Sequence, residues 1–171
     1  MDFTDDLNQC LQALREGQLV GIPGRAGWML AGNAADGQVM SVLMGIWQEN
    51  FFAADENLRP VILIADERDL LQYVSALDLA VFDWMDRQED TVAVWFDGIV
   101  GLPDCLLTEK GAVAISLARD DFNFHLIKRF RHPLAVFPVD RNLLPGLARF
   151  VTREHTMALK AGFDCKYSLI D

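Results

Sequence analysis

The chain has 171 residues, of which 51% are hydrophobic, and carries a net charge of −10 at pH 7. A chain of this length fits one domain, which buries about 70% of the surface that its unfolded form exposes. No apolar stretch approaches the roughly 18 consecutive residues of a membrane helix, and the start of the chain is acidic rather than basic. We therefore expect a single cytoplasmic domain over residues 1–171, with no membrane partner.

The first predicted element is a helix that Thr4 or Asp5 caps and Gly17 ends, because leucines recur between them at spacings of four and three. Residues 19–34 follow as a strand, an open loop and a second strand. In this stretch an apolar run stops at Pro23, loosens into glycines around one arginine and resumes. Since glycine lets the backbone approach a ligand closely, this loop is a candidate pocket wall, although an ordinary turn would have the same pattern.

A second helix is expected to begin at Asp36 and Gly37 and to run out near residues 47–50, before a loop at residues 51–58. Residues 61–65 form a short continuous apolar run, which is typical of a strand buried on both faces. Asp66 follows that run directly, where it can cap the next helix.

The rest of the chain continues the alternation of strands and helices. We expect helical patches at residues 66–73 and 77–85, strands at 91–96 and 112–117, a helix at 122–130, a strand at 134–137, and a short helix with a mixed tail at 143–171. Such alternation in one chain indicates the α/β class. The predicted fold is a single-domain twisted mixed sheet with flanking helices.

The order of these segments resembles the Sua5/YciO/YrdC family over roughly residues 7–142. The first family motif is matched by Leu14, Gly17, Leu19, Val20, Pro23, Trp28, Leu30, Ala31 and Ala34, without a gap. Later family strands are similar to residues 59–64, 113–117 and 133–140. The resemblance implies a YrdC-like, translation-factor-type domain and the synthesis of threonylcarbamoyl-AMP from threonine, bicarbonate and ATP for tRNA modification.

The apolar scaffold of the family is matched here, but its polar residues are replaced. Its motif threonines fall on Gly24 and Ala26, and its acidic residue falls on Arg25. Its phosphate-facing Lys and Arg fall on Trp47 and Glu49, its later Arg on Ser116, and its Ser and Asn on Pro138 and Asp140. Because phosphate recognition needs fixed positive donors, we expect the ATP-dependent chemistry to be lost. ATP and magnesium, which the resemblance implies, are therefore not expected as cofactors.

The favoured hypothesis is a non-catalytic binding module with a degenerate active site. We expect its pocket to be walled by Arg25, Trp28, Trp47 and Arg59, with Ser116 and Arg119 opposite, and to take a small planar or carboxylate-bearing ligand. No catalytic or metal-ligating set is predicted. Two alternatives remain: an enzyme of the same family with a rebuilt site, and an interaction protein that keeps only the fold.

Charge is unevenly distributed along the chain. Residues 1–110 hold six Lys and Arg against nineteen Asp and Glu, whereas residues 111–171 hold nine against six. Binding to nucleic acid requires cations that neutralise phosphates, so no DNA partner is expected, and the C-terminal third is the only plausible RNA contact. Its densest point contains Lys128, Arg129 and Arg131, although such a run is equally typical of a solvated helix end.

The three cysteines are Cys10, Cys105 and Cys165. They are far apart and odd in number, so they form neither a disulfide framework nor a paired metal site. We expect buried thiols.

Overall fold

The structure of the chain is a computed structural model. It describes residues 3–24, 27–50, 59–75, 77–88, 92–153 and 168–170, with the backbone alone for residues 50 and 168–170.

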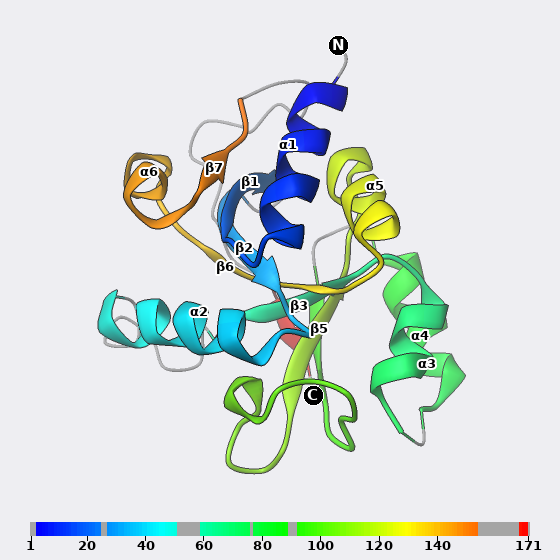
Figure 1. The fold of residues 1–171 in the computed structure, drawn as a ribbon. Helices are drawn as coiled ribbons and strands as arrows, with labels where there is room; N and C mark the ends of the chain where they lie inside the picture. The colour runs from blue at the N-terminus through cyan, green and yellow to red at the C-terminus, as the bar shows by residue number, and fades with distance from the viewer. Residues whose placement is uncertain are drawn as a thin grey trace.

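The strands of the described residues form one eight-stranded sheet in the order β7-β1-β2-β6-β3-β5-β4-β8 (Figure 1). Their bounds are β1 Val20–Gly24, β2 Gly27–Asn33, β3 Val61–Ile64, β4 Val92–Phe96, β5 Val113–Leu117, β6 Leu134–Pro138, β7 Phe150–Val151 and β8 Ser168–Ile170. Antiparallel pairs join β1 to β2, β2 to β6, β6 to β3, and β5 to β4, whereas β7–β1, β3–β5 and β4–β8 are parallel. The predicted α/β class and mixed sheet are confirmed.

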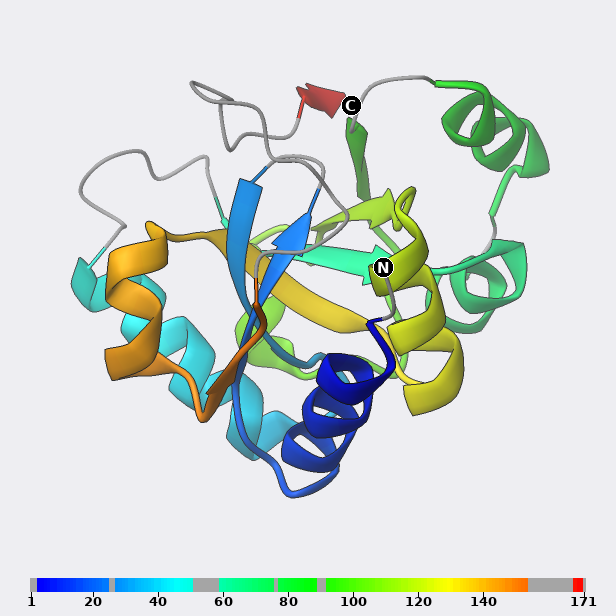
Figure 2. The same ribbon diagram turned by 90° about the horizontal axis from the view of Figure 1, so that it is seen from above.

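Helices cover both faces of this sheet. The α-helices are α1 Thr4–Arg15, α2 Gly37–Asn50, α3 Glu67–Tyr73, α4 Leu79–Arg87, α5 Asp121–Phe130 and α6 Leu144–Leu147, and the short 3₁₀ helices are η1 Asp104–Leu106 and η2 Arg141–Leu143. Helices α1 and α5 lie side by side in both views and pack on one face, which we call the α1–α5 face (Figure 1, Figure 2). Residues of α2, α3, α4 and α6 share a core with the opposite face, which we call the α2 face.

Side chains along each central strand alternate between these two faces. On β2, Leu30 packs in the core of the α2 face, while Met29 and Ala31 pack in the core of the α1–α5 face. On β3, Ile62 packs in the core of the α2 face and Leu63 packs in the core of the α1–α5 face. Because successive side chains of a strand point to opposite sides, the register decides which residues can meet at a common site.

Most expected elements are confirmed, and Asp66 caps α3 by accepting a hydrogen bond from the Asp69 backbone N–H at 3.2 Å. The expected cap of α1 is wrong, because the N-cap is Phe3, whose side chain makes no capping hydrogen bond. The predicted loop at residues 51–58 lies outside the described residues.

The tail contains two strands that periodicity did not indicate, β7 and β8, which pair with β1 and β4 at opposite edges of the sheet. Both are very short, so neither shows a recognisable alternation of apolar and polar residues. Part of this tail is fixed by Asp6 of α1, which is 3% exposed and accepts a hydrogen bond from the Arg153 backbone N–H at 3.0 Å.

The two cysteines of the described residues differ in burial. Cys10 is completely buried on α1, and this burial, with the nearby Asp6 carboxylate, raises the pKa of its thiol. The expectation of a buried thiol is wrong for Cys105, which is exposed on η1, where the neighbouring Leu106 enters the core instead. Cys165 lies outside the described residues.

Candidate functional site

The glycine-rich stretch at residues 19–34 forms an antiparallel hairpin of β1 and β2. Pro23 pairs with Trp28, and Gly24 pairs with Gly27, which adopts a φ of 114° that favours glycine. Arg25, which stands between Gly24 and Gly27 in the sequence, lies outside the described residues. The two expected strands are therefore present, but Pro23, Gly24, Gly27 and Trp28 are paired within the hairpin rather than placed in an open loop. The contribution of Arg25 to a site stays a prediction.

Trp28 is partly exposed beside the end of β6. Its backbone carbonyl accepts a hydrogen bond from the Val139 N–H at 3.1 Å. The guanidinium carbon of Arg141, on η2, lies 4.9 Å from the centroid of the Trp28 ring. Sequence reasoning missed Arg141, since only the pairing of β6 with β2 brings it to the indole. A cation over an indole face is attracted by the ring's quadrupole.

Trp47 and Arg59 form a second pair of the same kind. Trp47, near the end of α2, is 1% exposed, and the Arg59 guanidinium carbon lies 5.3 Å from its ring centroid. Arg59 also donates long hydrogen bonds to the carbonyl oxygens of Leu106 and Leu107, at 3.5 and 3.4 Å. Burial lowers the pKa of the Arg59 guanidinium. The structure thus brings these two predicted residues together, with Arg59 engaged by the protein itself.

Ser116 does not join this group. Its side chain is 1% exposed, and its hydroxyl donates a hydrogen bond to the carbonyl oxygen of Val92 at 2.7 Å. It lies on the α1–α5 face, like its register partner Leu63, whereas Trp28 and Trp47 pack on the α2 face. The sheet therefore separates Ser116 from the two indoles, although it was expected opposite them.

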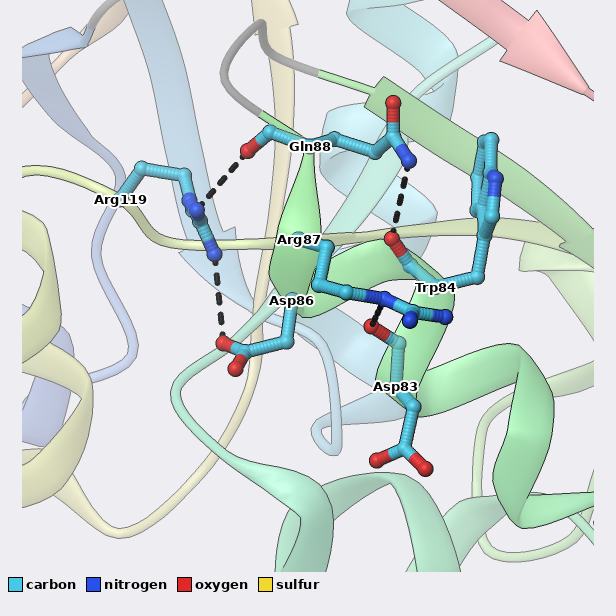
Figure 3. Close-up of polar contacts among 6 residues, drawn as sticks. All are labelled: Asp83, Trp84, Asp86, Arg87, Gln88 and Arg119. Atoms are coloured by element: carbon cyan, nitrogen blue, oxygen red, sulfur yellow. Dashed lines mark hydrogen bonds and ion pairs between the residues drawn. The ribbon is translucent and has the colours of Figure 1, made fainter.

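Arg119, which follows β5, is turned toward α4 (Figure 3). Its Nη1 lies 3.3 Å from Asp86 Oδ1, and its Nη2 donates a hydrogen bond to the Gln88 carbonyl oxygen at 2.8 Å. A carbonyl at the C-terminal end of a helix is one of those that lack an intrahelical partner, so a guanidinium is a suitable donor for it. The expected ligand contact of Arg119 stays a prediction, and its visible contacts hold the end of α4.

Asn123, on the first turn of α5, is a residue that sequence reasoning missed. It is 1% exposed, and its Nδ2 donates to the Pro23 carbonyl oxygen at 2.9 Å and to Asp120 Oδ1 at 3.1 Å. Its Oδ1 is buried without a hydrogen-bond partner in the described part of the chain. Asn123 thus joins α5 to the end of β1, immediately before the hairpin tip. No pattern around it in the sequence signals this contact.

The basic cluster at the end of α5 is exposed. Lys128 and Arg129 occupy its last turn, and Arg131 is the C-cap, with a left-handed φ of 69°. Lys128 Nζ donates to Asp66 Oδ2 at 2.5 Å. Desolvation alone would raise the pKa of the Asp66 carboxyl, but this hydrogen bond and those from backbone N–H groups hold it below its usual value. Asp66 therefore offsets one charge of the cluster.

The described residues contain no group of three or more His, Cys, Asp or Glu side chains that could hold a metal ion. None of the helices in these ranges is long and apolar enough to cross a membrane.

No protein-family model and no curated protein sequence matches the chain. Several solved structures are similar to the chain. The complex of P. abyssi Sua5 with L-threonine aligns with 88% of this chain at a TM-score of 0.71 and 15% identity. E. coli YciO aligns with 86% of it at 0.70 and 14% identity, and full-length HypF in a phosphate- and nucleotide-bound form aligns with 90% at 0.65 and 15% identity.

The chain has the Sua5/YciO/YrdC fold. The resemblance found in the sequence is thereby confirmed as a likeness of fold. The chain spans 47% of the length of that Sua5 structure, 76% of YciO and 26% of HypF. Sua5 and HypF both extend well beyond the region that aligns with this chain. The alignment therefore does not assign their complete activities to it.

Replacing Asn123 by Ala should lower the free energy of unfolding by about 1–3 kcal/mol, because the buried Pro23 carbonyl loses its side-chain donor. Urea unfolding followed by circular dichroism measures this loss. Asn142→Ala, at an exposed position, is the matched control and should change stability by less than about 0.5 kcal/mol. Equal effects of the two substitutions would contradict the role of Asn123 at the hairpin.

Proposed function

We propose that this chain is a divergent Sua5/YciO/YrdC-like binding module that takes a small planar or carboxylate-bearing ligand and does not carry out ATP-dependent threonylcarbamoyl-AMP synthesis. The observation that carries the proposal is the burial of Trp47 at a position where the family has a cation. The resemblance places a phosphate-facing lysine of the family at this position, and here the position holds a buried indole, 1% exposed, beneath the Arg59 guanidinium.

Arg59 is a poor substitute for that missing cation. Its guanidinium is engaged by the Trp47 ring on one side and by the carbonyl groups of Leu106 and Leu107 on another. A triphosphate would have to displace these contacts to gain a bidentate donor. Glu49, at the position of the second cation, is exposed and would repel a phosphate.

Other family positions have also lost the space or the groups for polar recognition. Gly24 stands where the resemblance places a threonine, and a Cβ atom there would lie 2.6 Å from Met29 Cε. A threonine would therefore require Met29 to move. Pro138, at the position of the family serine, pairs with Met29 and supplies no hydroxyl.

The remaining groups suit a flat ligand with one negative charge. Trp28 offers a partly exposed indole, and the exposed Arg141 guanidinium lies over it. An aromatic ring can stack on an indole, while a guanidinium binds a carboxylate through paired N–H donors. Arg25, one residue beyond β1 in the sequence, is the second cation of the proposed site.

With ATP, magnesium, L-threonine and bicarbonate present, the protein should form no threonylcarbamoyl-AMP and release no threonine-dependent pyrophosphate. Mass spectrometry and a coupled pyrophosphate assay measure the two products, with an active Sua5 enzyme as the positive control. Thermal unfolding with ATP and magnesium is the parallel test, since a ligand at 100 times its Kd adds about 2.7 kcal/mol of stability. Product formation would establish instead an enzyme with a rebuilt site.

Benzoate, a minimal planar carboxylate, should quench tryptophan fluorescence in a saturable manner. Arg141→Gln should raise its Kd about tenfold or more, because a charge-assisted hydrogen bond is lost. Trp28→Leu should weaken binding through the lost stacking surface. Arg68→Gln, an exposed arginine on α3, is the control and should leave binding unchanged. Absence of binding, with no ATP effect either, would favour an interaction protein that keeps only the fold.

RNA binding through the end of α5 is a second candidate. It is favoured by Arg129 and Arg131, which are exposed and have no acidic partner within the described ranges. The pairing of Lys128 with Asp66 and the net charge of −10 both weaken it. The expected contact is therefore confined to a few phosphates and is sensitive to salt.

Filter binding should retain tRNA or double-stranded RNA only at low salt. The double variant Arg129→Gln/Arg131→Gln should reduce the slope of log K against log salt by about 2, one unit for each lost phosphate contact. Arg68→Gln should leave that slope unchanged. No retention of RNA at any salt concentration would overturn this second candidate.

A further inference from the structure

A cleft of about 550 Å³ lies at the end of β1 that is opposite the hairpin tip. It is bounded by the end of α1, the turn into β1, the start of α2 and the segment after α6. We call it the α1–α2 cleft. It contains none of the residues that the sequence predicted for the ligand site. Its volume lies within the range of about 300–1,000 Å³ that is usual for small-molecule sites.

Backbone hydrogen bonds hold the walls of the cleft together. The Arg149 N–H donates to the Leu19 carbonyl oxygen at 2.8 Å, which joins the segment after α6 to the turn before β1. Gly17 closes α1 with a φ of 75°, and a Cβ atom there would lie 3.7 Å from a methyl of Val39 on α2. The segment after α6 is therefore fixed to the turn before β1, and the end of α1 lies close to α2.

Two guanidinium groups line the cleft from different elements. Arg15 lies in the last turn of α1, and Arg149 lies just before β7. Both are exposed, and neither side chain makes an ion pair or hydrogen bond with any other described residue. Paired arginines are well suited to a carboxylate, because each presents a planar fork of N–H donors.

Two carboxylates line the same cleft and balance these charges. Asp36 Oδ1 accepts hydrogen bonds from the backbone N–H groups of Gln38 and Val39, at 3.0 and 3.2 Å, so it is fixed at the start of α2. Glu16 Oε1 accepts a long hydrogen bond from the Gln12 amide at 3.5 Å. Because the lining has no net charge, a simple anion gains little there. A molecule with separate positive and negative groups can satisfy both signs.

The third component of the lining is apolar. Val39, Val42 and Leu147 contribute aliphatic side chains, and Val42 is 57% exposed. A ligand with an aliphatic group would cover this surface and gain from its removal from water.

We propose that the α1–α2 cleft binds a small amino-acid-like zwitterion with a branched aliphatic side chain. The carboxylate would lie between Arg15 and Arg149, the ammonium group near Asp36 and Glu16, and the side chain against Val42. This cleft is separate from the proposed ligand site at Trp28 and Arg141, so neither proposal depends on the other.

Three probes that share one aliphatic skeleton test the proposal on the unmodified chain. L-leucine should bind saturably in ¹H–¹⁵N NMR titrations with a Kd of about 1 mM or below, shifting the amides of Gly17, Gln18, Gln38 and Arg149. Its analogues 4-methylpentanoate, which lacks the ammonium group, and 3-methylbutylamine, which lacks the carboxylate, should each bind at least about tenfold more weakly. Equal binding of either analogue, or no saturable shift with L-leucine, would overturn the proposal.

Substitutions of the two cleft arginines test whether L-leucine binds in the α1–α2 cleft. Arg15→Gln and Arg149→Gln should each raise the Kd of L-leucine about tenfold, because each removes charge-assisted hydrogen bonds from the carboxylate. Arg68→Gln removes the same charge from α3 and should leave the Kd unchanged. The fold of each variant is checked by its amide spectrum outside the cleft. Undiminished L-leucine binding by both cleft variants would also overturn the assignment.

Discussion

The central strands of this protein are buried on both faces, and that constraint governs which side chains can act together. Strands β1, β3 and β5 have no exposed residue, so each position must fit either the α1–α5 core or the α2 core. A single step along a strand moves a side chain through the sheet. Ser116 is the clearest case, because Ile115 and Leu117 enter the α2 core and Ser116 therefore faces the other way.

Three polar residues of the expected site make contacts that hold the scaffold together. Ser116 is buried, so its hydroxyl needs an acceptor, and it finds the Val92 carbonyl on the neighbouring strand. Arg119 holds the end of α4, and Arg59 covers Trp47. A buried indole is stabilised by its apolar surroundings, whereas a cation there would have to be desolvated. For Glu49, one like-charge contact at 4 Å costs about 4 kcal/mol at an effective dielectric constant of 20, which is comparable with the whole binding energy of a millimolar ligand.

Three cations of the described residues form ion pairs with carboxylates from distant segments. Lys128 is matched by Asp66, Arg153 by Asp6, and Arg119 by Asp86. The α1–α2 cleft contains two carboxylates and two guanidinium groups, but these opposite charges are not paired with one another. The carboxylates accept hydrogen bonds from other groups, and the guanidinium groups donate none within the described chain. The partly exposed Lys128–Asp66 and Arg119–Asp86 pairs contribute little to stability, whereas the Asp6 carboxylate of the third pair is buried.

The sequence by itself determined the class of fold, the positions of the main helices and strands, and the likeness to Sua5 and YciO. These features depend on local periodicity, on turn residues such as Gly17, and on apolar runs such as residues 61–65, all of which can be read over short distances. The short strands β7 and β8 could not be found in this way, because each is defined by its partner strand rather than by its own pattern. Only the tertiary structure decided the grouping of site residues. It brought Arg141 to Trp28, Asn123 to Pro23 and Arg149 to Leu19, and it separated Ser116 from Trp47, because strand register and the packing of distant segments are set by the whole sheet.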